Sequence, residues 1–209
     1  MKHNGKCFII CPYDETDTLS EISVLENDIV ICADASYIKA TEHGITPDYI
    51  IGDFDSGSRP KNANCKIIEY PSEKDDTDTM LCVKKAIELG CKDIVIVGGI
   101  GGRLDHTLAN ISALLYADER DVKAILNGSG NKAFIVSSDA LIKKEEENTY
   151  ISFFPITATA CISLAGTKYK ASDLTIEQSF PIGTSNEITE DFAEITIHNG
   201  KILAVISRK

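Results

Sequence analysis

The sequence predicts an α/β domain with a parallel sheet over residues 1–130 and an all-β module over residues 131–209. Two observations lead to this division. In the first two-thirds, short apolar runs end in turns rich in Gly, Asp or Ser, and helix-like segments often follow them. After the turn sequence NGSGN at 127–131, no long helical pattern appears, and short apolar segments alternate with turns instead.

Six apolar runs in the first domain predict its strands. They are Cys7–Cys11, Ile29–Ala33, Tyr49–Ile51, Lys66–Ile68, Ile94–Val97 and Val122–Leu126. Near-continuous apolar runs of this length are typical of parallel strands that are covered on both faces. In such a sheet the functional loops lie at the carboxyl ends of the strands.

Three segments between these runs are predicted to be helices. The first runs from a capping Ser36 to His43, the second from Asp76 to Leu89, and the third from Leu104 to Tyr116. Helical spacing gives the third an apolar face, formed by Leu104, Leu108, Ile111 and Leu115.

The second module is predicted from five short apolar segments. They are Ala133–Val136, Tyr150–Phe154, Ala160–Leu164, Phe192–His198 and Lys201–Ile206. The dipeptide Asn199–Gly200 between the last two predicts a two-residue hairpin. The charged segment KKEEEN at 143–148 is expected to be a solvated turn rather than a site.

Charge and composition exclude several classes of protein. A net charge of −11 repels a polyphosphate backbone, which argues against nucleic-acid binding. No apolar stretch approaches the roughly 18–20 residues that span a bilayer, and the N-terminus lacks a signal-peptide pattern. The seven cysteines include no C-x-x-C pair, as expected for buried free thiols. We therefore expect a cytoplasmic protein without a membrane partner.

Two aspartates follow the third apolar run in the segment PDYIIGDFDSGS at 47–58. In an extended chain Asp53 and Asp55 point to the same face, whereas Phe54 points away. Two carboxylates on one face repel each other unless a cation joins them, and Mg²⁺ prefers such oxygen ligands together with substrate phosphates. The alternative is a pair of solvated turn acids.

Acids recur at the ends of two other strands. Asp34 follows the second run, and Asp75, Asp76 and Asp78 lie in PSEKDDTDT at 71–79, before the second helix. Acids in a first helical turn also stabilise the helix dipole, so capping remains an alternative for this group, most evenly for Asp76. Because parallel strands end at one edge of a sheet, we expect the acids to converge there.

A glycine-rich turn, GGIGG at 98–102, links a buried strand to the third helix. Glycines bring backbone N–H groups close to phosphate oxygens, and a helix N-terminus adds partial positive charge. The order of residues fits neither a P-loop nor the dinucleotide fingerprint. Beyond it, Arg103 is suited to a phosphate, and Asp105 and Asn110 to the nucleotide or to orienting Arg103. His106 has either a binding or a purely local role.

Together these segments resemble the thiamine pyrophosphokinase family. The resemblance is carried by CADAS at 32–36, GITPDYIIGDFDS at 44–56, EKDDTDT at 73–79, GGIGGRLDHTLANI at 98–111 and GTSNEI at 183–188. The family often has Ala-Asp-Gly-Gly-Ala-Asn at the first of these, where this chain has Ala-Asp-Ala-Ser-Tyr-Ile from residue 33. The resemblance implies a Rossmann-like ATP-binding domain, a C-terminal β-sandwich for thiamine binding and dimerisation, and a homodimer with active sites between subunits.

The activity implied by the resemblance is transfer of diphosphate from ATP to the thiamine hydroxyl, with Mg²⁺ as the cofactor. The implied metal ligands are Asp34, Asp53, Asp55 and Asp78, which with Arg103 form the catalytic set. The implied ATP-binding residues are Lys74, Asp75, Thr77, Gly99, Gly101, Gly102, Arg103, Asp105, His106 and Asn110. The resemblance implies that Ser185 and Asn186 contact thiamine. Without it, the residues of this segment predict only a polar loop. The alternatives are a diphosphokinase for another hydroxymethyl heterocycle, such as a pterin, and a non-catalytic nucleotide or thiamine sensor.

Overall fold

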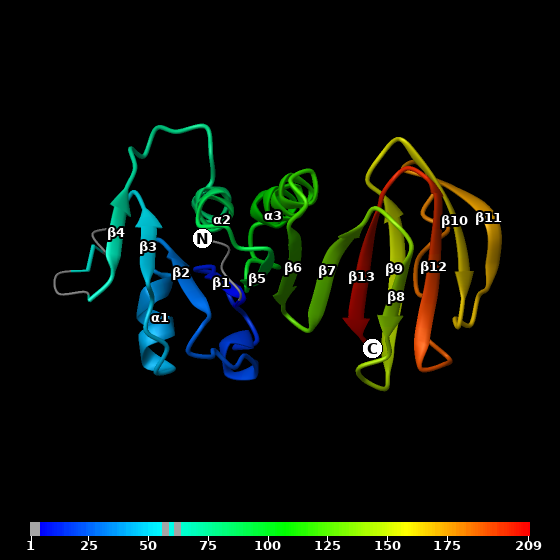
Figure 1. The fold of residues 1–209 in the computed structure, drawn as a ribbon, viewed down its shortest axis with the longest axis horizontal. Coiled ribbons are helices and arrows are strands. Elements are labelled where there is room, and N and C mark those ends of the chain that lie inside the picture. Colours follow the sequence, from blue (N-terminus) through cyan, green and yellow to red (C-terminus); the bar gives the residue numbers. More distant parts are fainter. Residues whose placement is uncertain (1–4, 56–58, 61–63) are drawn as a thin grey trace. The chain divides into compact units, whose positions relative to one another are not determined.

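The computed structural model describes residues 5–55, 59–60 and 64–209. Its contacts divide the chain into two compact units, Met1–Gly130 and Asn131–Lys209 (Figure 1), which we call the first and second units. Within the described part of the chain, no helix is long and apolar enough to cross a membrane.

Parallel strands form the sheet of the first unit, in the order β4-β3-β2-β1-β5-β6. Their bounds are β1 Cys7–Ile10, β2 Ile29–Ala33, β3 Tyr49–Gly52, β4 Lys66–Glu69, β5 Asp93–Val97 and β6 Lys123–Gly128. The six predicted strands are confirmed with small changes at their ends. The central strand β1 is buried along its whole length, as expected for a strand covered on both faces.

Helices cover both faces of this sheet. A short 3-10 helix spans Thr18–Glu21, and the α-helices are α1 Ser36–Glu42, α2 Asp78–Glu88 and α3 Leu104–Asp118. Figure 1 shows α2 and α3 on one face and α1 on the other. On the α1 face, Leu19 of the 3-10 helix and Ala40 of α1 belong to a buried cluster with Phe8, Ile10 and Val30.

The predicted cap of α1 is wrong. Ser36 is the first residue of the helix, and its hydroxyl donates to the Ile10 carbonyl at 2.7 Å, so it ties the helix to β1 instead. Helix α2 begins at Asp78 rather than Asp76, because Thr77 is its N-cap and accepts the Met80 N–H at 3.2 Å.

The predicted apolar face of α3 is also wrong. Leu104 and Leu108 are 71% and 56% exposed, whereas the helix buries Asn110, Ala113, Leu114 and Ala117. Apolar residues lie around most of this helix, so periodicity alone does not select the buried side. The small Ala113 and Ala117 allow the backbone to approach the sheet closely, which favours the observed face.

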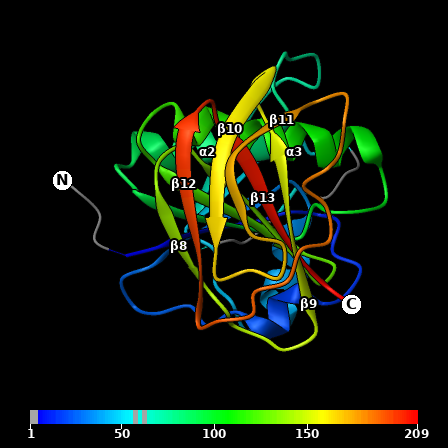
Figure 2. The same cartoon turned by 90° about the vertical axis from the view of Figure 1, so that its right-hand side faces the viewer.

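Two antiparallel sheets make up the second unit, in the orders β7-β13-β9 and β11-β10-β12-β8 (Figure 2). Their strands are β7 Asn131–Val136, β8 Ala140–Lys143, β9 Thr149–Pro155, β10 Thr159–Ala165, β11 Ala171–Glu177, β12 Phe192–Asn199 and β13 Ile202–Arg208. Alternate residues of both sheets, such as Phe153 and Ile162, share one buried cluster. The edge strands β8 and β11 were not predicted, because their exposed residues weaken the apolar signal.

The predicted hairpin at Asn199–Gly200 does not form. Strand β12 pairs with β10 and β8, whereas β13 pairs with β7 and β9, so the turn carries the chain from one sheet to the other. Gly200 does adopt φ +77, and a Cβ there would lie 2.5 Å from the Thr159 carbonyl oxygen. The dipeptide therefore predicts a tight turn correctly but not the pairing of its flanking strands.

Candidate active site

The sheet order of the first unit places a topological switch point between β1 and β5. From β1 the strands β2, β3 and β4 follow on one side, and β5 and β6 lie on the other. Loops that leave such neighbours in opposite directions open a crevice at the carboxyl ends of the strands, where α/β proteins bind their ligands. Here the Gly99 N–H donates to the Tyr13 carbonyl at 2.6 Å, which joins the loops after β5 and β1.

Asp34 lies at this edge, directly beside the end of β3. Its N–H donates to the Ile51 carbonyl at 2.8 Å, and its backbone has φ 46. A Cβ on Gly52 would lie 2.8 Å from the Asp34 Cα and 3.1 Å from its Oδ1. The glycine of the GDFDS segment is therefore needed for the close approach of the first acidic loop to the second.

Two segments distant in sequence meet at Lys74. Its Nζ lies 2.6 Å from Asp53 Oδ2, after β3, and 3.1 Å from Asp78 Oδ1, at the start of α2. The side chains of Lys74, Asp53 and Asp78 are only 13%, 16% and 27% exposed. The predicted convergence of acids from separate strand ends thus occurs around a largely buried ammonium group.

The pKa shifts in this cluster follow from its packing. The hydrogen bond from Lys74 lowers the pKa of Asp53. Burial raises the pKa of Asp78, the Lys74 charge opposes this effect, and the negative charges of Asp53 and Asp34 add to it. Burial disfavours the charge on Lys74, but its interactions with Asp53 and Asp78 outweigh burial and raise its pKa. Asp34, Asp53, Asp78 and Lys74 therefore form one interacting group, which we call the acidic cluster.

One oxygen of the acidic cluster is buried against a single cation. Asp78 Oδ1 is buried, and the group that it faces among the described residues is the Lys74 ammonium at 3.1 Å. Carboxylate oxygens are the ligands that Mg²⁺ prefers, so the donor chemistry fits this ion. Within the described ranges no three His, Cys, Asp or Glu side chains are already arranged as a metal site, and Lys74 stands between two of the carboxylates.

Asp55 lies at the exposed side of these acids. Phe54 has φ 53 and is buried in the apolar cluster below β2 and β3, so the chain is no longer extended after Gly52. Asp55 is exposed, and its N–H donates to Asp53 Oδ1 at 3.3 Å. The extended conformation from which a shared face was predicted is therefore absent, but the side chains of Asp53 and Asp55 still interact. Residues 56–58 of this segment lie outside the described residues.

The remaining residues before α2 have local roles in the structure. Asp76 pairs with Lys84 at 2.6 Å along the helix, Thr77 caps the helix, and Asp75 is exposed. Thr79, in the first turn, contacts Cys11 across a 3.5 Å Oγ1–Sγ distance, which fixes the helix start against the loop after β1.

The glycine loop is held in shape from inside the first unit. The Asn110 side chain, 4% exposed, donates from Nδ2 to the Gly99 carbonyl at 2.8 Å. Gly99 has φ +74, and a Cβ there would lie 2.4 Å from the same Nδ2. Asn110, predicted to contact nucleotide or to orient Arg103, instead shapes the loop. The Gly101 N–H donates to Thr107 Oγ1 at 3.1 Å.

Tyr13 is a residue of this site that the sequence did not single out. Its ring lies against the glycine loop, and a Cβ on Gly102 would lie 2.7 Å from the Tyr13 Cε2. The sequence signal for it is an aromatic residue just after the strand that forms the switch point. The outer end of the glycine loop therefore has an aromatic neighbour.

Arg103 and Asp105 form an exposed pair at the start of α3. The Arg103 Nη2 and Nε donate to the two Asp105 carboxylate oxygens at 2.6 and 3.1 Å, and the side chains are 72% and 63% exposed. The His106 N–H donates to Asp105 Oδ1 at 3.0 Å. Asp105 thus orients the Arg103 guanidinium at the solvent side of the glycine loop, as one of the sequence interpretations has it.

The GTSNE segment of the second unit is built around Asn186. This residue is 5% exposed; its Oδ1 accepts the N–H groups of Tyr169 at 2.9 Å and Glu187 at 2.8 Å, and its Nδ2 donates to the Tyr169 carbonyl at 2.9 Å. Ser185 has φ 58 and is exposed, and its N–H donates to Ser152 Oγ at 3.0 Å. Asn186 therefore locks the loop that presents Ser185.

Replacing Asn186 with Ala is expected to lower the free energy of unfolding by roughly 2–4 kcal/mol, because it removes the three hydrogen bonds that this buried side chain makes to the backbone of Tyr169 and Glu187. Denaturant unfolding of the full chain measures this. Ser185→Ala is the matched control, since the exposed hydroxyl lies on the same loop and its loss is expected to change stability by less than about 0.5 kcal/mol. Equal stability of the two variants would contradict the locking role.

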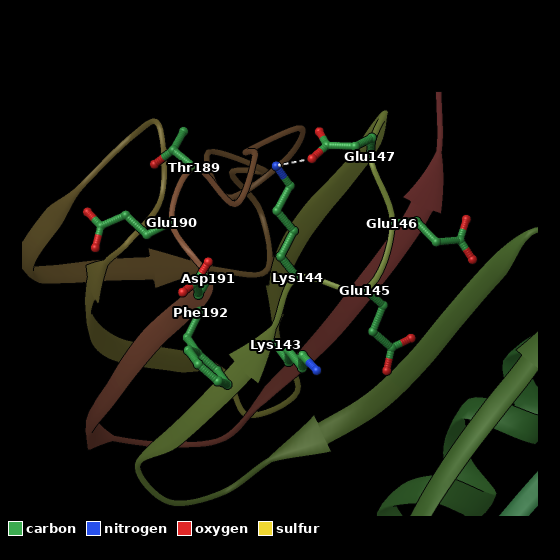
Figure 3. Close-up of a pocket in the computed structure, with 9 residues that line it drawn as sticks. All are labelled: Lys143, Lys144, Glu145, Glu146, Glu147, Thr189, Glu190, Asp191 and Phe192. Atoms are coloured by element: carbon green, nitrogen blue, oxygen red, sulfur yellow. Dashed lines mark ion pairs between the residues drawn. The ribbon is translucent and has the colours of Figure 1, made fainter.

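A pocket of about 420 Å³ also lies in the second unit (Figure 3). Its walls are the segment after β8 and the segment before β12, namely Lys143, Lys144, Glu145, Glu146, Glu147, Thr189, Glu190, Asp191 and Phe192. The figure shows the acidic side chains spread around the rim, with Lys144 paired to Glu147 at 2.9 Å. The KKEEEN segment thus forms one wall of a charged depression that contains none of the predicted site residues.

Comparison with known proteins identifies both parts of the chain. The family "Thiamin pyrophosphokinase, catalytic domain" matches residues 22–126, and "Thiamin pyrophosphokinase, vitamin B1 binding domain" matches residues 140–202. The thiamine pyrophosphokinase of Bacillus subtilis is 28% identical over 189 residues, which are 87% of this chain and 88% of the relative. Thiamin pyrophosphokinase 1 of Caenorhabditis elegans is 30% identical over 68% of this chain and 63% of the relative.

Solved structures show the same fold. The crystal structure of the Bacillus subtilis enzyme superposes with a TM-score of 0.87 at 25% identity, covering 98% of this chain and 99% of that one. Thiamin pyrophosphokinase from Candida albicans gives a TM-score of 0.80 at 19% identity, covering 99% and 90% of the two chains. With both domain families matched in order along the chain, this protein belongs to the thiamin pyrophosphokinase family of enzymes.

Proposed function

We propose that this enzyme transfers a diphosphate group from ATP to the hydroxyl of thiamine, giving AMP and thiamine diphosphate. Membership of the family supports the reaction, and the acidic cluster beside the glycine loop is the observation that carries it. Carboxylates that converge from β2, β3 and α2 suit a site for a metal-bound polyphosphate, whereas a sensor that only binds has little need for them.

Mg²⁺ is the cofactor that this proposal requires. Asp34, Asp53 and Asp78 would hold it, with the exposed Asp55 as a further predicted ligand. When bound, the ion would neutralise charge on the ATP phosphates. The buried Asp78 Oδ1, which already faces a cation in the Lys74 ammonium at 3.1 Å, supports this assignment.

The residues around the cluster would position the phosphates. Backbone N–H groups of the glycine loop and the N-terminus of α3 offer partial positive charge, and Arg103, oriented by Asp105, adds a guanidinium. The thiamine oxygen would form a bond to the β-phosphorus. The bond between that phosphorus and the oxygen that links it to the α-phosphorus would break, and AMP would leave with this oxygen. The hydroxyl proton would pass to a carboxylate of the site.

The finer features of the proposal concern architecture and assembly. The strand order, which reverses between β1 and β5, supports a Rossmann-like nucleotide domain. The exposed Leu104 and Leu108 on α3 are apolar surface that a second copy would cover in a homodimer. Ser185 and Asn186 are proposed for thiamine binding in the second unit. The seven free cysteines suit a cytoplasmic location.

AMP release tests the proposal. Purified protein with ATP and Mg²⁺ is expected to form AMP and thiamine diphosphate in equal amounts when thiamine is added, as measured by chromatography. A chelator in excess over Mg²⁺ is expected to abolish the reaction. Release that depends on a hydroxymethylpterin instead would change the substrate, and absence of AMP with every acceptor would contradict an enzymatic role.

A further inference from the structure

Lys74 has an unusual position for a residue expected to contact a nucleotide. Its ammonium group lies 2.6 Å from Asp53 Oδ2 and 3.1 Å from Asp78 Oδ1, with its side chain only 13% exposed. The same two carboxylates are proposed metal ligands. Lys74 therefore occupies the side of the acidic cluster on which a cation is needed.

The charges explain why a lysine is placed there. Carboxylates packed together and partly buried repel one another strongly, and a buried charge without a partner destabilises the fold. The negative charges of Asp53 and Asp34 both raise the pKa of Asp78, as expected for neighbouring carboxylates. A compact ammonium with three donors is the side chain that most resembles a small cation.

We propose that Lys74 is an internal counter-cation, which holds Asp53 and Asp78 together before a metal binds and leaves them when the metal arrives. Two cations that share the same carboxylate oxygens repel each other, so the metal and Lys74 compete. The flexible stem of a lysine allows the released ammonium to move to the nucleotide phosphates. The inference rests on the metal site of the proposed function and adds a positioning role for Lys74, which delays tight metal binding until nucleotide is present.

A second lysine provides a matched control. Lys84 pairs with Asp76 at 2.6 Å, the same distance as that between Lys74 and Asp53, but it contacts the two oxygens of one carboxylate rather than two carboxylates. That pair is more exposed, at 39% and 30%, and Asp76 is not a proposed ligand. The two lysines are therefore replaced by Gln in turn. A general effect of removing a lysine charge near α2 is expected in both Lys74→Gln and Lys84→Gln, whereas loss of the counter-cation affects only Lys74→Gln.

Titration of the full chain with Mn²⁺ in the absence of nucleotide tests the competition. Lys74→Gln is expected to bind Mn²⁺ about 10-fold or more tightly than the original chain, because the competing ammonium is gone. Lys84→Gln is expected to bind it unchanged. The melting temperature of Lys74→Gln is expected to be lower without metal and to rise more on saturation with Mn²⁺. Unchanged or weaker Mn²⁺ binding by Lys74→Gln would overturn the inference.

A measurement on the unaltered protein covers the case in which Lys74→Gln does not fold. Acetylation of lysines, followed site by site by mass spectrometry, is expected to be several-fold faster at Lys74 when Mn²⁺ is present, and unchanged at Lys84. An unchanged rate at Lys74 over millimolar Mn²⁺ overturns the inference, even if thiamine-dependent AMP release is normal. Absence of that release in the original chain is the separate result that contradicts the proposed function.

Discussion

Replacing Asp53 with Asn is expected to lower kcat by at least about 10²-fold, because one negative oxygen of the proposed metal site is lost while the shape of the side chain is kept. Both the sequence and the structure put Asp53 at the carboxyl end of β3, within the acidic cluster. It follows β3 directly, it is 16% exposed, and its Oδ2 contacts Lys74 at 2.6 Å. Steady-state rates of AMP release at saturating thiamine and ATP, over a range of Mg²⁺, measure the effect.

The matched control for this prediction is Asp76→Asn. Asp76 is also an aspartate paired to a lysine at 2.6 Å, but its partner is Lys84 and the pair lies outside the acidic cluster. The kcat of Asp76→Asn is expected to stay within about twofold of the original value, since an ion pair near the surface contributes little to stability and this one touches no proposed ligand. Comparable losses in both variants would show that general charge, rather than the acidic cluster, governs turnover, and a nearly normal Asp53→Asn would remove Asp53 from the metal site.

The meeting of the acidic segments was predictable, but its detail was not. The apolar runs identify parallel strands, and the parallel-sheet rule alone brings Asp34, Asp53 and Asp78 to one edge. The conformation between Asp53 and Asp55, which was expected to be extended, has a tertiary cause. Phe54 turns into the apolar cluster through a positive φ, which breaks the alternation that an extended chain would have. Local pattern cannot reveal a conformation selected by burial elsewhere.

The other errors have the same origin. Asn199–Gly200 gives a tight turn, yet the pairing of β12 and β13 depends on which sheet each strand completes. The buried face of α3 depends on close packing of Ala113 and Ala117 rather than on its exposed leucines. Lys74 illustrates the limit most clearly, because its spacing of four residues from Asp78 is visible in sequence whereas its contact with Asp53, 21 residues away, is not.

Replacing Gly99 with Ala is expected to have the second large effect, on both stability and nucleotide binding. The residue has φ +74, which an L-amino acid adopts at a cost of about 1 kcal/mol. The new Cβ would also lie 2.4 Å from Asn110 Nδ2 and 3.1 Å from Cys11 Sγ, both in buried side chains. Relief of this clash must disturb the 2.8 Å hydrogen bond from Asn110 to the Gly99 carbonyl.

We therefore expect Gly99→Ala to lose roughly 2–4 kcal/mol of unfolding free energy, the sum of left-handed strain, overpacking and a weakened buried hydrogen bond. The KM for ATP is expected to rise about 10-fold, because N–H groups of a displaced loop no longer face the phosphates. Gly44→Ala separates these causes, since Gly44 has nearly the same φ, +72, but nothing lies within 4 Å of the added Cβ. The free energy of unfolding of Gly44→Ala is expected to fall by only about 1 kcal/mol, and its KM for ATP is expected to stay unchanged. Equal behaviour of Gly99→Ala and Gly44→Ala in denaturant unfolding and in ATP titrations would contradict the claim that packing against Asn110 shapes the proposed nucleotide site.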